Sequence, residues 1–147
     1  MVLVERATPA DRAEAERLIA AYHASEGGTP KPERISWAVE QAIKNRFPSV
    51  LLVARDRRAV VGVALAVYSP SAELGRVLVV NDFFVDPAAR RKGVGRGLAT
   101  RLLEEATAMH VDRIDLEVLP TNLVATAFWR SMGFRSEGRT IYSCDLT

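Results

Sequence analysis

The spacing of apolar residues along this chain changes several times, and each change predicts a different element of secondary structure. A short apolar run predicts a first strand over residues 2–6. Helical spacing then predicts a helix from Thr8 to about His23, in which Thr8 is the cap and Pro9 lies in the first turn. A second helix is expected to begin near Pro32. Its apolar face carries Ile35, Val39, Ala42 and Ile43.

Three apolar strands are predicted in the middle of the chain. They cover residues 50–54, 59–68 and 76–85, with charged or turn-forming residues between them. The third strand is apolar except for Asn81-Asp82 near its end, a local conflict that marks either a β-bulge or a functional position. Asp86-Pro87 is expected to close this strand, because proline cannot continue the hydrogen-bonded ladder.

Helices and strands alternate in the rest of the chain. The pattern predicts a helix over residues 94–109, a strictly alternating strand over 113–118, and a last helix that follows Pro120-Thr121-Asn122 and ends at Gly133. Two short strands, near residues 134–137 and 140–145, complete the chain. The order β-α-α-β-β-β-α-β-α-β-β predicts one domain over residues 1–147, of the α/β (α+β) class, with a mixed central sheet covered by helices.

Composition and charge narrow the class of protein. The apolar share of 48% and the charged share of 26% are ordinary for a globular domain, and no apolar run approaches the roughly 18 residues of a membrane span. Cys144 is the only cysteine, so no internal disulfide forms, and a cytoplasmic location without membrane association is expected. The net charge of +2 is too small and too dispersed to indicate nucleic-acid binding, and no His/Cys/Asp spacing indicates a metal site.

One dense basic cluster stands beside glycines, in the segment Arg90-Arg91-Lys92-Gly93-Val94-Gly95, which Arg96 extends. The segment follows a predicted strand and opens a predicted helix, whose first N–H groups have no internal partner and carry partial positive charge. Glycines allow phosphate oxygens to approach those N–H groups, and arginine can hold phosphate with two donors. The loop therefore predicts a compact phosphate-bearing ligand, although it has neither the Walker ending nor the dinucleotide spacing.

Two ordered motifs make the sequence resemble the GCN5-related N-acetyltransferases (GNAT). The first runs from Asn81 through the basic loop to Gly95. The second is similar to that family's pattern Leu-Glu-Val, then Asn-x-x-Ala-x-x-Phe-Tyr-x-x-x-Gly-Phe. It consists here of Leu116-Glu117-Val118, Asn122, Ala125, Phe128-Trp129 and Gly133-Phe134. The resemblance implies the GNAT fold, with a splay between the fourth and fifth strands, and an N-acetyltransferase that uses acetyl-CoA as cosubstrate and needs no metal.

The resemblance also assigns roles in cofactor binding. The strand residues Phe83, Phe84 and Val85 are expected to pair through their backbone with the pantetheine arm of coenzyme A, which fills the splay. The loop residues Arg90, Arg91, Lys92, Gly93, Val94, Gly95 and Arg96 are expected to hold the pyrophosphate. Asn122 matches a residue that contacts the arm from the other side, and Trp129 occupies a cofactor-side position.

Catalytic roles are less closely determined. Glu117 matches a glutamate that is the base in some relatives, and its alternative is an exposed strand carboxylate. Asp82 is the second candidate base, because Asn81 stands where many relatives have an acid; its alternative is to support a bulge. Trp129 replaces the tyrosine proposed to protonate the CoA thiolate, and indole is not an acid near neutral pH. Water, Tyr142 or Tyr22 are the alternatives for that proton.

The acceptor is expected to be a primary amine, of a polyamine-like or amino-acid-like molecule or of a protein or peptide. The stretch from Asn81 to Val85 resembles the spermidine/spermine acetyltransferase branch in particular. Candidate acceptor-site residues lie in the first two helices: Tyr22, His23, Glu26 and Trp37. The competing interpretation is a catalytically degenerate acyl-CoA sensor or interaction module, which Trp129 and Asn81 favour. A homodimer is an expectation by analogy only.

Overall fold

The computed structural model describes residues 2–147, which form two compact units, one ending at Glu117 and the other covering Val118–Thr147. In chain order, the first unit contains β1 (Val2–Arg6), η1 (Pro9–Asp11), α1 (Arg12–Ser25), α2 (Pro32–Ile43), β2 (Ser49–Asp56), β3 (Ala59–Ser71), β4 (Gly75–Val85), η2 (Pro87–Ala89), α3 (Val94–Ala108) and β5 (Arg113–Leu116). The second unit contains α4 (Leu123–Ser131). None of the helices in residues 2–147 is long and apolar enough to cross a membrane.

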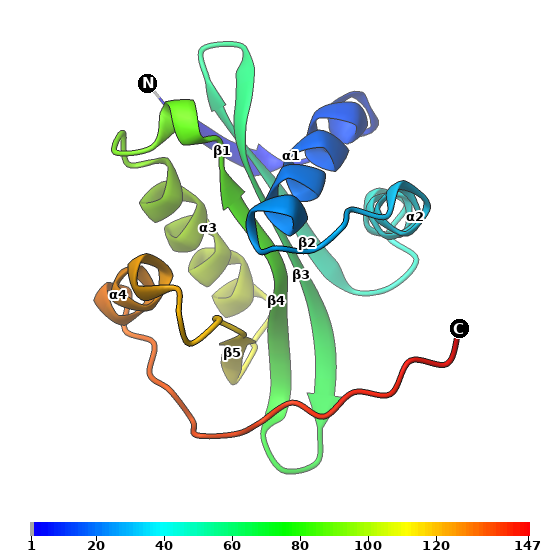
Figure 1. Ribbon diagram of the computed structural model, residues 1–147, viewed down its shortest axis with the longest axis vertical. Helices are drawn as coiled ribbons and strands as arrows, with labels where there is room; N and C mark the ends of the chain where they lie inside the picture. Colours follow the sequence, from blue (N-terminus) through cyan, green and yellow to red (C-terminus); the bar gives the residue numbers. More distant parts are fainter. Residues whose placement is uncertain (1) are drawn as a thin grey trace. The chain divides into compact units, whose positions relative to one another are not determined.

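The strands form one mixed sheet in the order β1-β2-β3-β4-β5 (Figure 1). Neighbouring strands are antiparallel from β1 to β4, whereas β4 and β5 are parallel. The parallel pair follows from the connection, because α3 carries the chain back along the sheet before β5 begins. The predicted mixed sheet and the order of the first nine strands and α-helices are confirmed.

Both faces of the sheet are buried, which explains why β2 is a continuous apolar run (Figure 1). Val50, Leu52 and Ala54 pack with α3, and the intervening Leu51 and Val53 pack with α1 and α2. From the helices, the α3 side receives Val94, Leu98, Leu102 and Ala106. The other side receives Ala15, Leu18, Ile19, Ile35 and Val39. The sequence periodicity identified these faces correctly.

A β-bulge interrupts β4 at Asn81. Leu65 of β3 lies opposite Asp82, but the next residue, Ala66, lies opposite Val80, so Asn81 is the extra residue. Before the bulge, Leu78 and Val80 belong to the α3-side core; after it, Phe84 belongs to the α1-side core. The extra residue therefore reverses the faces of the last part of β4, which strict alternation would have left unchanged.

The pairing between β4 and β5 ends directly before this bulge. Its register runs from Val77↔Arg113 to Val80↔Leu116, while β4 continues to Val85. The last part of β4 is therefore paired with β3 on one edge and extends past the end of β5 on the other (Figure 1). This is the arrangement expected for a splay between the fourth and fifth strands.

The last two predicted strands are wrong, because no strand is assigned within residues 134–147. The alternating residues there face solvent, with Ile141 64% and Tyr142 92% exposed. Alternating apolar and polar residues suit a strand with one buried face, but a short hairpin is only marginally stable without a sheet to pair with. The last strand of the sheet in residues 2–147 is β5, which also stops two residues earlier than the sequence predicts.

The second unit is organised by the ends of α4. Asn122 caps the helix, since its side-chain Oδ1 accepts a hydrogen bond of 3.0 Å from the Ala125 N–H. At the other end, Gly133 adopts a left-handed conformation (φ 93°), and the N–H of Phe134 returns to the carbonyl of Trp129 at 3.0 Å. The predicted stop at Gly133 is confirmed.

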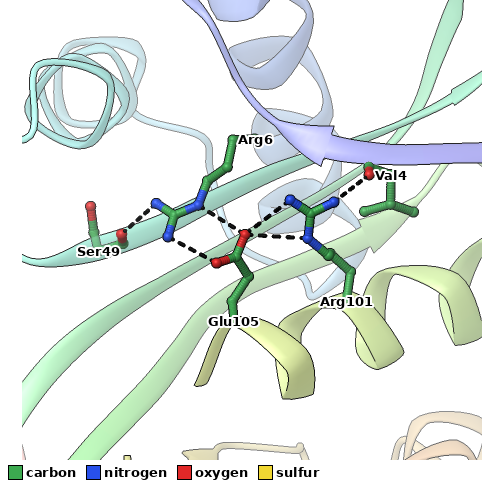
Figure 2. Close-up of polar contacts among 5 residues, drawn as sticks. All are labelled: Val4, Arg6, Ser49, Arg101 and Glu105. Carbon is green, nitrogen blue, oxygen red and sulfur yellow. Dashed lines mark hydrogen bonds and ion pairs between the residues drawn. The ribbon is translucent and has the colours of Figure 1, made fainter. Parts of the chain in front are cut away.

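Figure 2 shows a carboxylate that connects β1 to α3. Glu105 accepts hydrogen bonds from Arg6 at 3.1 and 3.2 Å and from Arg101 at 3.1 and 3.2 Å. The two guanidinium groups also donate to backbone carbonyls, Arg6 to Ser49 and Arg101 to Val4. The Glu105 side chain is only 16% exposed, so this network closes the edge of the α3-side core.

We expect Glu105→Gln to lower the free energy of unfolding by about 1 kcal/mol at pH 7, because an amide loses the ionic part of these hydrogen bonds. The hydrogen bond from Arg6, followed by those from Arg101, holds the pKa of Glu105 below its ordinary value of 4.5. A lowered pKa stabilises the fold above the ordinary value, and this contribution is lost as the pH falls through the folded value. The difference between variant and wild type in urea unfolding should therefore shrink below pH 4.5.

The control is Glu104→Gln, which neutralises the exposed neighbouring residue on α3. Equal losses of stability in the two variants at pH 7 would show that the network does not stabilise the fold.

Candidate active site

A buried acid lies where β4 passes the last turn of α1. The bulge places Asp82 on the α1 side of the sheet, together with Phe84. There the Asp82 Oδ1 lies 2.7 Å from the His23 Nε2. The Asp82 side chain is 11% exposed, whereas that of His23 is 36% exposed. The pair therefore has a buried acidic end and a solvent-facing imidazole.

Burial has a cost for Asp82. It raises the pKa of this carboxyl above the ordinary value of 3.8, and the hydrogen bond to His23 offsets only part of the increase. In physical terms, the low-polarity surroundings disfavour the ionised form more than the imidazole stabilises it. A buried carboxyl with one specific partner is a recognised mark of a functional site.

Tyr22 lies beside this pair, and the charges around it affect its pKa. Its ring packs against Phe84 at 6.2 Å between centroids. Burial, followed by the negative charges of Glu26, Asp82 and Glu117, raises the pKa of Tyr22 to about 12. Three carboxylates therefore act on one phenol. A phenol with so high a pKa is a weaker acid than an ordinary tyrosine, whose pKa is 10.0, which argues against Tyr22 as the proton donor that the sequence left open.

Glu117 is exposed and directly follows β5, at the point where pairing with β4 has ended. Its charge contributes to the raised pKa of Tyr22, so the end of β5 and the last turn of α1 share an electrostatic environment. Sequence analysis proposed Glu117 and Asp82 separately, and the structure brings both to the surroundings of Tyr22.

The predicted phosphate loop connects β4 to α3. Arg91 (φ 66°) and Gly93 (φ 79°) both adopt left-handed conformations, and a Cβ added at Gly93 would have no heavy atom within 4 Å. The N–H of Gly97 makes the first helical hydrogen bond, to the carbonyl of Gly93 at 3.0 Å. In an α-helix, the N–H groups before this bond have no partner within the helix itself. A loop with open space beside such a helix start suits an anionic group such as phosphate.

The side chains of the loop do not all serve the same purpose. Arg90 folds back on β4: its Nε donates to the carbonyl of Val85 at 3.2 Å, and its guanidinium lies 5.4 Å from the centre of the Phe84 ring. Lys92 lies 3.9 Å from Asp56. Arg91 and Arg96 are exposed, whereas Val94 is fully buried in the α3-side core and can offer a ligand only its backbone. Arg90 thus contacts the end of β4 in this structure, and its role as a phosphate ligand stays a prediction.

The strand residues predicted to meet the pantetheine arm differ in orientation. Phe83 and Val85 pack against the α3-side core, and Phe84 is buried on the α1 side. All three pair with β3, at Ala64, Val63 and Gly62, and lie beyond the end of the β4–β5 register. The outer backbone edge of this segment is where an extended ligand could add as a strand.

In the second unit, Asn122 and Trp129 have structural roles of their own. Asn122 caps α4 through Oδ1, and this cap leaves the amide NH₂ as a separate donor group. Trp129 is 7% exposed and packs edge-on against Phe128 and Phe134, with centroids 4.9 and 5.0 Å away. Packing accounts for the tryptophan, and its role toward a cofactor stays a prediction.

Comparison with known proteins identifies the family. The sequence profile of the acetyltransferase (GNAT) family matches residues 14–134. The chain belongs to the GNAT acetyltransferase family. This confirms the resemblance inferred from the two motifs.

Individual relatives agree with this assignment. Mycothiol acetyltransferase of Beutenbergia cavernae is 38% identical over 65 residues, a match that covers 44% of this chain and only 21% of that protein. A crystal structure of a probable acetyltransferase has a TM-score of 0.84 at 24% identity, covering 99% of this chain and 98% of that one. The structure of AAC(6')-Iy with the bisubstrate analogue CoA-S-monomethyl-acetylneamine has a TM-score of 0.83 at 14% identity, covering 100% and 99%. At these identities the two structures establish a shared fold.

The GNAT chain shows no metal centre in the part that the structure describes, since residues 2–147 contain no group of three or more His, Cys, Asp or Glu side chains placed to hold a metal ion. What sequence reasoning missed is the pairing of His23 with Asp82. Both residues were candidates, but for different roles. The only sequence signal for the pair was the interruption of β4 by Asn81-Asp82.

We expect Asp82→Asn to raise the melting temperature at pH 7 relative to wild type. Because the pKa of Asp82 is raised in the folded protein, its ionisation lowers the free energy of unfolding. This loss is absent below the ordinary pKa of 3.8 and grows as the pH rises toward the pKa of the folded state. The advantage of the amide should therefore be absent near pH 3.5 and present near neutrality, as measured by thermal unfolding across this range. Asp145→Asn, at an exposed position, should show no such pH-dependent advantage.

The opposite result would be a wild-type protein that is more stable than Asp82→Asn by the same margin at pH 7 and at low pH. It would contradict a net cost of the buried charge.

Proposed function

We propose that this GNAT chain transfers the acetyl group of acetyl-CoA to a primary amine that carries positive charge in its free state. The observation that carries the proposal is the set of carboxylates, Glu26, Asp82 and Glu117, that acts on Tyr22 beside the end of the β4–β5 pairing. Clustered negative charge attracts an ammonium group and favours its approach. A polyamine, an amino acid or a peptide amine has the required chemistry.

The loop between β4 and α3 is the proposed pyrophosphate site. Its donors are the first-turn N–H groups of α3, and its attractive charge comes from Arg90, Arg91, Lys92 and Arg96; Arg90 also donates a hydrogen bond to the carbonyl of Val85. The outer edge of Phe83 to Val85 is the proposed track for the pantetheine arm. Asn122 and Trp129 are also proposed as cofactor-binding residues, through the side-chain NH₂ group and the indole.

Residues 1–147 are proposed to act as one acetyltransferase domain. The family match supports this, since residues 14–134 include parts of both compact units.

The reaction requires the ammonium to lose a proton so that the nitrogen lone pair can attack the thioester carbonyl. The C–N bond then forms, the C–S bond breaks, and the electron pair leaves with the sulfur of coenzyme A. The attacking nitrogen gives up its second proton to solvent, so that the product is the neutral amide. A positioned base contributes about 10²–10⁴-fold to such a step. Glu117 and Asp82 are the candidate carboxylates, either as a base or as charges that hold the ammonium. With Trp129 in place of a tyrosine, the thiolate leaves unprotonated or takes its proton from water.

A degenerate acyl-CoA sensor is the second candidate. It is favoured by the burial of Trp129 between two phenylalanines at the position where the family usually has an acid. The carboxylates around Tyr22 favour the enzyme, because a sensor would need the loop that binds coenzyme A but no acidic site for an amine.

We expect Gly95→Asp to weaken the binding of coenzyme A by more than about tenfold, since a carboxylate at the second residue of α3 repels pyrophosphate and obstructs the N–H groups. An acid near a helix N-terminus stabilises the helix, so the variant should fold. Calorimetric titration with coenzyme A measures the effect. Thr100→Asp places the same charge at an exposed position farther along α3 and should bind nearly as wild type. Unchanged affinity in a folded Gly95→Asp protein would refute the loop assignment.

Thiol release from acetyl-CoA, measured against a panel of polyamines, amino acids and peptides, tests the activity itself. We expect turnover with at least one cationic amine, and a fall of about tenfold or more in kcat/KM for Glu117→Gln, because a charge near the acceptor is removed. Tight binding of coenzyme A without turnover on any acceptor would favour the sensor.

A further inference from the structure

His23 is the exposed member of a hydrogen-bonded pair whose other member is buried. It occupies the last turn of α1, and its Nε2 lies 2.7 Å from Asp82 Oδ1. An ionised carboxylate only accepts hydrogen bonds, so Nε2 carries the proton and Nδ1 keeps its lone pair. The buried acid therefore fixes both the tautomer and the orientation of the ring.

Burial limits what Asp82 itself can do. Its side chain is 11% exposed and one oxygen is already engaged by His23, so an acceptor amine would meet the imidazole first, which is 36% exposed. Other acids lie near this part of the site: Asp82 on β4, Glu26 on α1 and Glu117 after β5 all contribute negative charge at the neighbouring Tyr22.

We propose that His23 is the general base of the acetyl transfer and that Asp82 is its positioning residue. The inference rests on the proposed function. His23 Nδ1 takes a proton from the acceptor ammonium, and the freed lone pair of the amine attacks the thioester carbonyl. The C–N bond forms, the C–S bond breaks, and coenzyme A leaves with the electron pair. The attacking nitrogen gives up its second proton to water or to the departing thiolate, which leaves the neutral amide. The imidazolium returns its own proton to water.

This assignment changes the parts played by the two carboxylates. Asp82 acts through another residue and does not touch the acceptor. Glu117, exposed at the end of β5, attracts and orients the ammonium. The proton-accepting step then needs an imidazole, which can exchange protons near neutral pH, whereas an ordinary exposed carboxylate is too weak a base for an ammonium.

The kinetic test compares His23→Gln and Asp82→Asn with His110→Asn, which alters the only other histidine and suits its left-handed backbone (φ 58°). Using the amine that supports turnover in the wild-type protein, we expect kcat to fall about 100-fold or more in His23→Gln. The Kd for coenzyme A should stay within about threefold, since the loop is unaltered. Asp82→Asn should lower kcat as well, and adding it to His23→Gln should change the rate less than about twofold.

Two further measurements separate positioning from a merely structural role. Added imidazole should restore part of the activity of His23→Ala and none of that of Glu117→Gln. Nitrogen-15 NMR of histidine-labelled protein, with His110→Asn used for assignment, should show the Nε2–H tautomer at His23 in wild type and lose that preference in Asp82→Asn.

The outcomes distinguish this inference from the proposed function. Wild-type turnover with unchanged kcat in His23→Gln overturns the role of His23 and leaves the acetyltransferase proposal intact. Loss of activity in Asp82→Asn with full activity in His23→Gln makes Asp82 the direct base and overturns the inference, as does an Nδ1–H tautomer at His23. A wild-type protein that binds coenzyme A and acetylates no amine overturns both proposals.

Discussion

The bulge at Asn81 is the constraint on which the arrangement of the site depends. If Asn81 were paired as in a regular strand, Asp82 would continue the α3-side series of Leu78 and Val80 and place a carboxyl in a core built from aliphatic side chains. Burial of an unpaired charge is among the most destabilising changes a core can carry. The bulge turns this acid to the opposite face, where the last turn of α1 supplies His23. The same reversal places Phe84 beneath α1 and Phe83 on the α3 side.

The bulge also coincides with the end of the parallel pairing, because Val80 is the last residue of β4 in register with β5. A bulge bends and twists its strand, which is consistent with two strands that stop pairing at this point. Within a short stretch of chain the backbone therefore passes the acid–imidazole pair, presents an outer strand edge, and reaches the first turn of α3. An extended ligand with a phosphate at one end and a reactive group at the other matches this order. The features of the site are sequential in the chain as well as adjacent in the fold.

Local signals in the sequence predicted most of the fold and the loop. The apolar spacing predicted the strands and helices from β1 to α4, including the start of α3 at Val94, and Gly133 predicted the end of α4, because each of these signals depends on neighbouring residues. The pairing of His23 with Asp82 was not predictable in the same way, since the residues are 59 positions apart and only the packing of α1 on β4 joins them. The prediction of the last two strands was wrong for a related reason. Alternation of apolar and polar residues suits a strand with one buried face, but it does not identify the strand edge with which that segment pairs.

Binding and catalysis depend on different parts of the chain. The proposed pyrophosphate site uses backbone N–H groups at the start of α3, beside an open, left-handed position at Gly93. The proposed proton transfer uses side chains, and Asp82 among them opposes stability, because burial raises the pKa of its carboxyl. Trp129, by contrast, packs in a cluster of aromatic rings at the position where the family usually has a tyrosine. Under the proposed assignment, His23 and Asp82 supply the means to activate an amine, whereas Trp129 supplies no acid that could protonate a thiolate.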